Sequence, residues 1–152
     1  MKIKLLNENA KLPTRHNETD AGLDLYSAEE VFIPVGENLV ISTGIAISLP
    51  KGTFGKIEDR SSLASKGLKT AGGVIDEGYI GEIKIVMNNL TNKTLWHGGP
   101  EKYGYKVNIG DKIAQLIIIK YESPTIENVK EFNDSSINDK KRGLFGWGSS
   151  GR

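Results

Sequence analysis

Apolar and polar residues alternate in short runs along most of this chain, and glycine, proline and asparagine separate the runs. Alternation with a period of two places every second side chain on the same face of a strand. Many short runs at this spacing are typical of an all-β sandwich or barrel. The pattern predicts strands at Lys2–Leu6, Val31–Pro34, Leu39–Ser42, Gly44–Leu49, Thr53–Glu58, Gly81–Asn88, Lys112–Tyr121 and Thr125–Phe132.

The segment Gly72–Asn89 predicts a β-hairpin that can hold a small planar ligand. Gly72 and Gly73 carry no side chains, so that backbone groups there can approach the edge of a ligand closely. Asp76 and Tyr79 lie around the predicted turn, which is marked by an acidic residue followed by glycine. The second arm alternates so that one face carries Ile83, Ile85 and Met87.

A short helix is predicted at Ser61–Lys66, where a serine can cap the start and Gly67 can end it. Arg60 and two serine hydroxyls then lie at a helix N-terminus, which favours anions. Asp24 follows a glycine and reads as the start of a strand. Gln115 is an amide among apolar neighbours, and a buried amide needs hydrogen-bond partners.

Two stretches break the strand pattern. Leu90–Asn108 is rich in glycine and asparagine and predicts a long excursion between strands. The chain is polar from Asn133 and ends in KKRGLFGWGSSGR. An arginine, two aromatic residues and two serines among glycines suit a flap over phosphates, through backbone N–H groups and a guanidinium. We therefore predict a β domain at 1–132 and a flexible linker with a glycine-rich C-terminal lid at 133–152.

Composition narrows the function classes. A chain of 152 residues has the length of a single domain. A net charge of +1 gives no overall basic field for nucleic acid, and the absence of cysteine excludes disulfides and thiolate metal sites. His16 and His97 are interpreted as solvated loop residues. With no signal peptide and no apolar run of about 20 residues, we expect a soluble cytoplasmic protein with no membrane partner.

In chain order, the segments AGLDLYS, DRSSLASKG, GGVIDEGYIGE, GDKIAQL and RGLFGWGSSG resemble the five motifs of the homotrimeric dUTP diphosphatases, or dUTPases. The resemblance covers Lys2 to Gly151. It implies a distorted jelly roll of the β-clip type with one short helix. It also implies a homotrimer whose three active sites lie at subunit boundaries. The implied reaction is hydrolysis of dUTP to dUMP and pyrophosphate by attack of water at the α-phosphorus, with Mg²⁺ as cofactor.

The resemblance also implies roles for individual residues. Asp76 matches the catalytic carboxylate that orients and deprotonates the attacking water. Tyr79 matches the ring under the deoxyribose, and Asp24 matches the carboxylate that holds the metal through water. The backbone around Thr70, Gly73 and Ile75 matches the segment that reads the uracil edge. The other matching substrate contacts are Arg60, Ser61, Ser62, Gln115, Arg142, Trp147, Gly148 and Ser149, and Lys84 on the second arm of the hairpin joins them as either a contact or an exposed strand lysine.

The sequence departs from the dUTPase pattern at several points. Asp59 stands where a proline is common, and a carboxylate beside a triphosphate is repulsive unless it points away. Ser62 replaces a usual glycine, Trp147 replaces a usual phenylalanine, and Phe145 occupies a position that is usually small. The Leu90–Asn108 excursion is about ten residues longer than the family implies.

Two alternatives remain open at this point. The dCTP deaminases share the implied fold, but their glutamate would lie ten residues after the hairpin aspartate, where this chain has Val86. A non-catalytic relative that senses a nucleotide and binds a protein would use the Leu90–Asn108 excursion as its interface. Every catalytic position of the dUTPase pattern nevertheless carries a competent side chain, which favours the hydrolase.

Overall fold

The computed structural model describes residues 1–91 and 104–130, and the regular structure within them is nearly all β. One four-stranded sheet has the order β1-β4-β8-β6, and a second has the order β2-β10-β5-β7. The strands of the first are β1 (Lys2–Leu5), β4 (Asn38–Ser48), β8 (Glu82–Asn89) and β6 (Leu68–Ala71). Those of the second are β2 (Leu23–Tyr26), β10 (Lys112–Lys120), β5 (Thr53–Glu58) and β7 (Val74–Ile75).

The inner faces of the two sheets form one hydrophobic core. Strand β8 alternates as predicted, with Ile83, Ile85 and Met87 each at most 1% exposed. They pack in one cluster with side chains of the second sheet, among them Leu25 of β2 and Leu116 of β10. Burying an aliphatic side chain of this size contributes about 1.5–3 kcal/mol, so the core fixes which face of each strand points outward.

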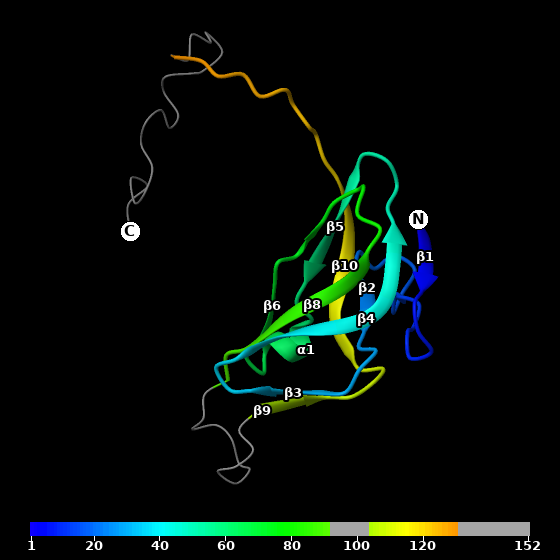
Figure 1. Cartoon of the computed structure of the whole chain (residues 1–152), viewed down its shortest axis with the longest axis vertical. Coiled ribbons are helices and arrows are strands. Elements are labelled where there is room, and N and C mark those ends of the chain that lie inside the picture. The colour runs from blue at the N-terminus through cyan, green and yellow to red at the C-terminus, as the bar shows by residue number, and fades with distance from the viewer. Residues whose placement is uncertain (92–103, 131–152) are drawn as a thin grey trace. The chain divides into compact units, whose positions relative to one another are not determined.

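Strand β10 brings together residues of the candidate site described below. It pairs antiparallel with β2 on one side and β5 on the other, as Figure 1 shows. The register places Gln115 opposite both Asp24 and Glu58. Residues from three distant parts of the sequence therefore lie side by side in one row across the sheet.

The predicted hairpin is more complex than two paired arms. Strand β8 pairs with β6 (Figure 1), with Thr70 opposite Met87. Strand β7 is not part of that sheet and pairs with β5 of the other one. The segment between β6 and β8 therefore crosses from one sheet to the other. The prediction that the two arms pair with each other is wrong for the first arm, because β7 pairs with β5 and not with β8. The sequence pattern does not indicate which strand is the partner.

Strand boundaries also differ from the predictions. The two strands predicted on either side of Thr43 are one strand, β4, whose register shifts between Ser42 and Ala46. Glu82 stabilises this irregularity, because its carboxylate accepts hydrogen bonds from the Ser42 hydroxyl and from Gly44 N–H. The strand predicted at Thr125–Phe132 is wrong over 125–130, where no strand forms; residues 131 and 132 lie outside the described residues.

Three further elements complete the described chain. Strand β3 (Val31–Pro34) pairs with β9 (Gly104–Val107) as a separate two-stranded sheet (Figure 1). The predicted excursion thus contains a strand in its last part. The helix α1 (Ser61–Ala64) is two residues shorter than predicted. By its contacts the chain divides into Met1–Glu122, which holds all these elements, and Ser123–Arg152.

Among the described residues, no helix has the length and apolar character needed to cross a bilayer.

Candidate active site

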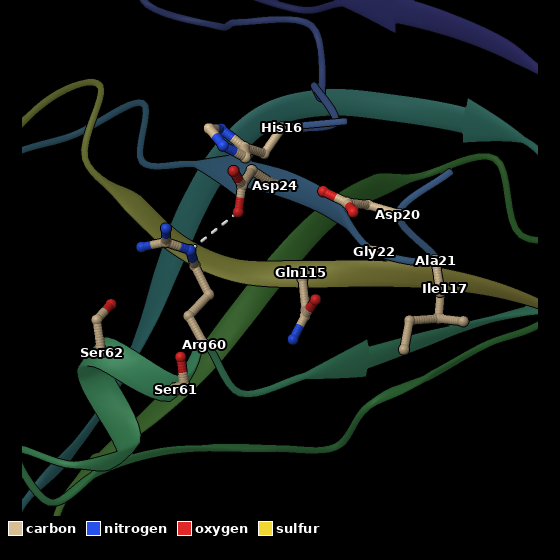
Figure 2. A pocket seen from close by; sticks show the side chains of 10 residues that line it. All are labelled: His16, Asp20, Ala21, Gly22, Asp24, Arg60, Ser61, Ser62, Gln115 and Ile117. Atoms are coloured by element: carbon tan, nitrogen blue, oxygen red, sulfur yellow. Dashed lines mark hydrogen bonds and ion pairs between the residues drawn. The ribbon is translucent and has the colours of Figure 1, made fainter. Parts of the chain in front are cut away.

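A cavity of about 360 Å³ opens where β2, β10 and the start of α1 meet. Figure 2 shows Arg60 reaching from the start of α1 to Asp24, with the Ser61 and Ser62 side chains on the same element. The predicted residues Asp24, Arg60, Ser61, Ser62 and Gln115 all line this cavity. The shared row of β2, β10 and β5 brings them together, since Arg60 follows β5 by two residues.

Asp24, which lines this cavity, lies between two cations. Its Oδ1 is 2.9 Å from Arg60 Nε, and its Oδ2 is 2.6 Å from Lys112 Nζ. The hydrogen bond to Asp24 raises the pKa of Lys112, so the ammonium remains charged at neutral pH. The two cations offset the charge of Asp24, and Arg60 lines the cavity, where a guanidinium suits a phosphate oxygen.

The sequence analysis did not predict Lys112 as a site residue. The register between β10 and β2 shifts between Lys112 and Ala114, and strand periodicity does not predict such a local irregularity. Arg60 Nη1 also donates to the Lys112 carbonyl, at 3.1 Å. The two cations are therefore fixed relative to each other by backbone as well as by Asp24.

The half-buried side chain of Gln115 has the hydrogen-bond partner that such an amide needs. Its Nε2 donates to the Asp59 carbonyl at 2.7 Å. A Cβ on Gly22 would overlap Gln115 Oε1, so the glycine before β2 leaves the space that the amide occupies. Gly22, His16 and Asp20 also line the cavity and were not predicted as site residues. His16 lies in a loop, as expected, and this loop forms part of the cavity wall.

The start of α1 differs from the prediction. Its N-cap is Arg60 and not a serine, and no side chain caps it. The Ser61 and Ser62 side chains belong to the first turn and are exposed. The hydroxyls are thus positioned to contact a ligand and do not serve as caps.

A second cavity, of about 510 Å³, lies beside the crossing segment and is lined by Val74, Ile75, Asp76, Tyr79, Glu82 and Lys84. Tyr79 N–H donates to the Asp76 carbonyl at 3.0 Å, which closes the predicted turn. The Tyr79 hydroxyl donates to the Glu82 carbonyl at 2.9 Å, so the ring is held at both ends. Within the described residues, the exposed Asp76 carboxylate has no side-chain hydrogen bond or ion pair, and its oxygens are open to water.

The turn after Asp76 is anchored by its neighbour. Glu77 Oε2 accepts a hydrogen bond from Gly52 N–H at 2.8 Å, and it lies 3.4 Å from the Tyr121 hydroxyl. Repulsion from the Glu77 charge raises the pKa of Tyr121. The loop that carries Asp76 is therefore tied to the turn before β5 and to the end of β10.

A third cavity, of about 300 Å³, lies between β5 and the glycine segment Thr70–Val74. Ile57 N–H donates to the Gly73 carbonyl at 2.7 Å, and a Cβ on Gly73 would lie 2.7 Å from the Ile57 carbonyl oxygen. Gly72 has φ +65°, a backbone conformation that favours glycine. The two glycines are thus needed for packing on β5 and for a turn, in addition to their predicted role in ligand approach.

The structure groups the predicted residues into two separate parts. The cavities beside Asp76 and beside Gly73 share Val74, whereas the cavity around Arg60 shares no lining residue with either. Arg142, Phe145, Trp147, Gly148 and Ser149 lie outside the described residues, as does His97. Val86, the position that a deaminase would fill with glutamate, is a half-buried strand residue opposite Val40.

The fold and these cavities define a nearly all-β protein with guanidinium, hydroxyl and amide donors in one cavity and an exposed carboxylate in another. Comparison with known proteins identifies the family. The dUTPase family model matches residues 8–151, and the chain belongs to that family. The deaminase alternative finds no support in this match.

Curated relatives and solved structures agree with the family assignment. The chain is 44% identical over 154 residues to a deoxyuridine 5′-triphosphate nucleotidohydrolase of Clostridioides difficile, covering 99% of this chain and 97% of the relative. It is 42% identical over 142 residues to the enzyme of that name from variola virus, covering 93% and 86%.

Among solved structures, the Staphylococcus bacteriophage 80alpha dUTPase with dUPNHPP superposes with a TM-score of 0.86 at 34% identity, covering 99% of this chain and 98% of the phage chain. A dUTPase mutant from phage phi11 of S. aureus, described with a structural Mg(II) ion, gives a TM-score of 0.78 at 36% identity, covering 86% and 97%. The distorted jelly-roll class that the sequence predicted is confirmed.

Proposed function

We propose that this chain hydrolyses dUTP to dUMP and pyrophosphate, as expected of a dUTPase. The observation that carries the proposal is the pairing of two sites. One is the cavity lined by Arg60, Gln115 and the α1 serines, and the other is an exposed carboxylate, Asp76, beside the glycine segment. A nucleoside triphosphate needs both kinds of site.

Asp76 acts as the general base in this proposal. Its carboxylate accepts a proton from a water molecule, and the water oxygen forms a bond to the α-phosphorus. The bond from the α-phosphorus to the oxygen that bridges to the β-phosphate breaks, and pyrophosphate leaves with the electron pair. The open oxygens of Asp76 and the anchored turn after it support this role, because in-line attack requires a positioned base.

The glycine segment selects the base and the sugar. Backbone groups of Thr70, Gly73 and Ile75 pair with the uracil edge, where a cytosine amino group would bring a donor against a donor. Unpaired polar groups then reject cytosine. The ring of Tyr79 lies under the deoxyribose and leaves no room for a 2′-hydroxyl. The hydrogen bond from its hydroxyl to the Glu82 carbonyl supports this role by fixing the ring.

The cavity around Arg60 binds the phosphates. Arg60, Ser61, Ser62 and Gln115 supply a guanidinium, two hydroxyls and an amide, which are suitable donors for phosphate oxygens. Lys84 lines the cavity of Asp76, ion-paired to Glu82 at 3.6 Å, and adds a further cation there.

The donor set fits a magnesium ion that arrives with the substrate. Within 1–91 and 104–130 no cluster of three or more ligating side chains exists. Asp24 and Asp20 are the carboxylates that line the phosphate cavity. Mg²⁺ prefers a few carboxylates, retained waters and substrate phosphates. When bound, it neutralises charge on the phosphate oxygens. We assign Asp24 to hold it through water.

The C-terminal segment 133–152 supplies the lid in this proposal. Arg142 contacts the γ-phosphate, Trp147 stacks on the uracil ring, and Gly148 and Ser149 donate to phosphate oxygens. A closed lid excludes water other than the nucleophile.

We further propose that the active unit is a homotrimer. Within one chain, the phosphate cavity shares no lining residue with the cavity beside Asp76 or with the one beside Gly73. A second copy that brings its phosphate cavity to the Asp76 of the first would complete the site, and cyclic symmetry would generate three such sites.

Product analysis tests the reaction. The protein is incubated with dUTP, and separately with dCTP, in Mg²⁺ and in excess EDTA, and the products are separated by chromatography. We expect dUMP and pyrophosphate from dUTP alone, with loss of activity in EDTA and in Asp76→Asn. Glu37→Gln, which neutralises an exposed carboxylate in the turn between β3 and β4, is the matched control and retains activity. A uracil nucleotide formed from dCTP would contradict the proposal.

Subunit mixing tests the shared site. Asp76→Asn and Arg60→Ala, each inactive alone, are unfolded together and refolded in equal amounts. If each site takes its base from one copy and its phosphate cavity from another, roughly a quarter of the sites regain both intact parts. If every site lay within one chain, the mixture would stay inactive.

A further inference from the structure

Asp59 lies between the phosphate cavity and the base-reading segment of one chain, which belong to different active sites of the proposed homotrimer. It lies between the end of β5 and Arg60, and its side chain lines the cavity beside Gly73. Its backbone carbonyl accepts the hydrogen bond from Gln115, which lines the phosphate cavity. One residue therefore contacts both the phosphate side and the base-reading side.

The carboxylate of Asp59 binds Thr70 at two atoms. Its Oδ1 accepts hydrogen bonds from Thr70 N–H at 2.7 Å and from the Thr70 hydroxyl at 2.8 Å. Its Oδ2 is 3.5 Å from Lys69 Nζ. Burial raises the pKa of Asp59, but the hydrogen bonds from Thr70 and the charge of Lys69 lower it by more, so the group is ionised at neutral pH.

The position of β6 in its sheet explains why this contact matters. Strand β6 is at the edge of the sheet, and only one side of its backbone pairs with β8. An N–H on the other side has no strand partner and needs another acceptor. Asp59 supplies that acceptor at Thr70, and the hydroxyl contact fixes the Thr70 side chain as well.

A second contact holds the other end of the same segment. Ile57 N–H donates to the Gly73 carbonyl at 2.7 Å. Ile57 and Asp59 belong to the end of β5 and the residue after it, so Thr70 and Gly73 are both held against this one stretch of backbone. The segment from 70 to 73, which we assign to the uracil edge, is therefore fixed at both ends.

We propose that Asp59 is a positioning residue for base selection: its carboxylate holds Thr70 and thereby sets the backbone groups that read uracil, without contributing to phosphate affinity. This inference rests on the proposed function of the Thr70–Ile75 segment. It also answers the electrostatic objection to an acidic residue next to Arg60. The carboxylate points to β6, and only the backbone carbonyl of Asp59 faces the phosphate side.

The test separates affinity for the base from affinity for the phosphates. The inhibition constants of dUMP and of inorganic triphosphate are measured for the wild type and four variants, together with kcat and KM for dUTP and dCTP. Asp59→Ala removes the acceptor, whereas Asp59→Asn keeps an oxygen that can accept both Thr70 bonds. Thr70→Val removes only the hydroxyl contact. Lys69→Ala, the matched control, removes only the ion pair to Oδ2.

We expect Asp59→Ala to weaken dUMP about tenfold and to lower the preference for dUTP over dCTP by a similar factor, since hydrogen bonds to a charged acceptor are lost. Triphosphate affinity should stay within about twofold, because the backbone carbonyl that holds Gln115 is retained. The loss should fall on KM more than on kcat. Asp59→Asn should restore most of the dUMP affinity, Thr70→Val should show part of the loss, and Lys69→Ala should resemble the wild type.

Equal loss of dUMP and triphosphate affinity would show a general structural role and overturn the proposal. Unchanged dUMP affinity in a folded Asp59→Ala would also overturn it. If that variant does not fold, Thr70→Val decides the matter, and its full retention of dUMP affinity and base preference would count against the proposal. Gly73→Ala tests the assignment of the base segment separately from the role of Asp59. If this variant leaves dUMP affinity unchanged, the assignment of the segment to the base fails, whatever the result for Asp59.

Discussion

Replacing Gly73 with alanine should displace the base-reading segment from β5. The new Cβ would lie 2.7 Å from the Ile57 carbonyl oxygen, and ordinary contact begins at 3.4 Å, so the backbones must separate by about 0.7 Å. Neither atom belongs to a flexible side chain, and the hydrogen bond from Ile57 N–H to the Gly73 carbonyl weakens as well. Overpacking of this kind costs about 1–3 kcal/mol. A misplacement approaching 1 Å in a binding segment can lower kcat/KM by about 100-fold.

Two nearby glycines calibrate the effect. Gly72→Ala meets only Val86 Cγ2, at 3.9 Å, but has φ +65°, so it tests backbone strain of about 1–2 kcal/mol without a clash. Gly78→Ala meets nothing within 4 Å and has no positive φ, so we expect a change within about 0.5 kcal/mol.

Urea unfolding measures the stability of the three variants, and steady-state kinetics with dUTP measures the site. We expect Gly73→Ala to lose the most in kcat/KM and Gly78→Ala to match the wild type. Wild-type KM in a folded Gly73→Ala, or equal losses in all three, would refute the reasoning from β5 contact.

Three further outcomes follow from the contacts of charged residues. Glu77→Gln should move the pKa of Tyr121 down toward its ordinary value of 10.0, because the Glu77 charge is the largest cause of its rise; ultraviolet titration against Tyr121→Phe checks this. Burial raises the pKa of Glu82, but two hydrogen bonds and a neighbouring lysine hold it below its ordinary 4.5. Its stabilisation is therefore present above about pH 4.5 and lost as pH falls below it, so urea melts of wild type and Glu82→Gln should converge in acid. Arg60→Lys should raise the KM for dUTP about tenfold, because an ammonium cannot replace the guanidinium contacts to Asp24 and the phosphates; an unchanged KM would contradict this.

The regular strands were predictable because their pattern is long and strict. Strand β8 alternates over its whole length, and β5 and β10 were located to within a residue. Strand β7 has only two residues, which is too short for any periodicity, and its sheet depends on a backbone partner in β5. At 125–130 the two apolar residues, Ile126 and Val129, are three positions apart and would point to opposite faces of a strand, so the prediction there rested on β-branched residues and not on alternation.

The site was predictable in composition but not in detail. Asp24, Arg60 and Gln115 are far apart in the sequence, and only the resemblance to a family grouped them before the register of β10 was known. The ion pair of Lys112 depends on a register irregularity, and the direction of the Asp59 side chain depends on an edge strand. Both are consequences of three-dimensional pairing, for which the linear pattern carries no signal.

The central position of β10 also bears on how the molecule opens. Amides in a strand that is paired on both sides exchange with solvent only in large unfolding events, whereas those of edge strands and turns exchange in small local ones. Gln115 of β10 belongs to the first kind, and the crossing segment between β6 and β8 belongs to the second. Hydrogen exchange should therefore show slow amides along β10, at the floor of the phosphate cavity, and fast ones around Asp76. Partly opened molecules would keep their affinity for phosphates after they have lost the ability to distinguish one base from another.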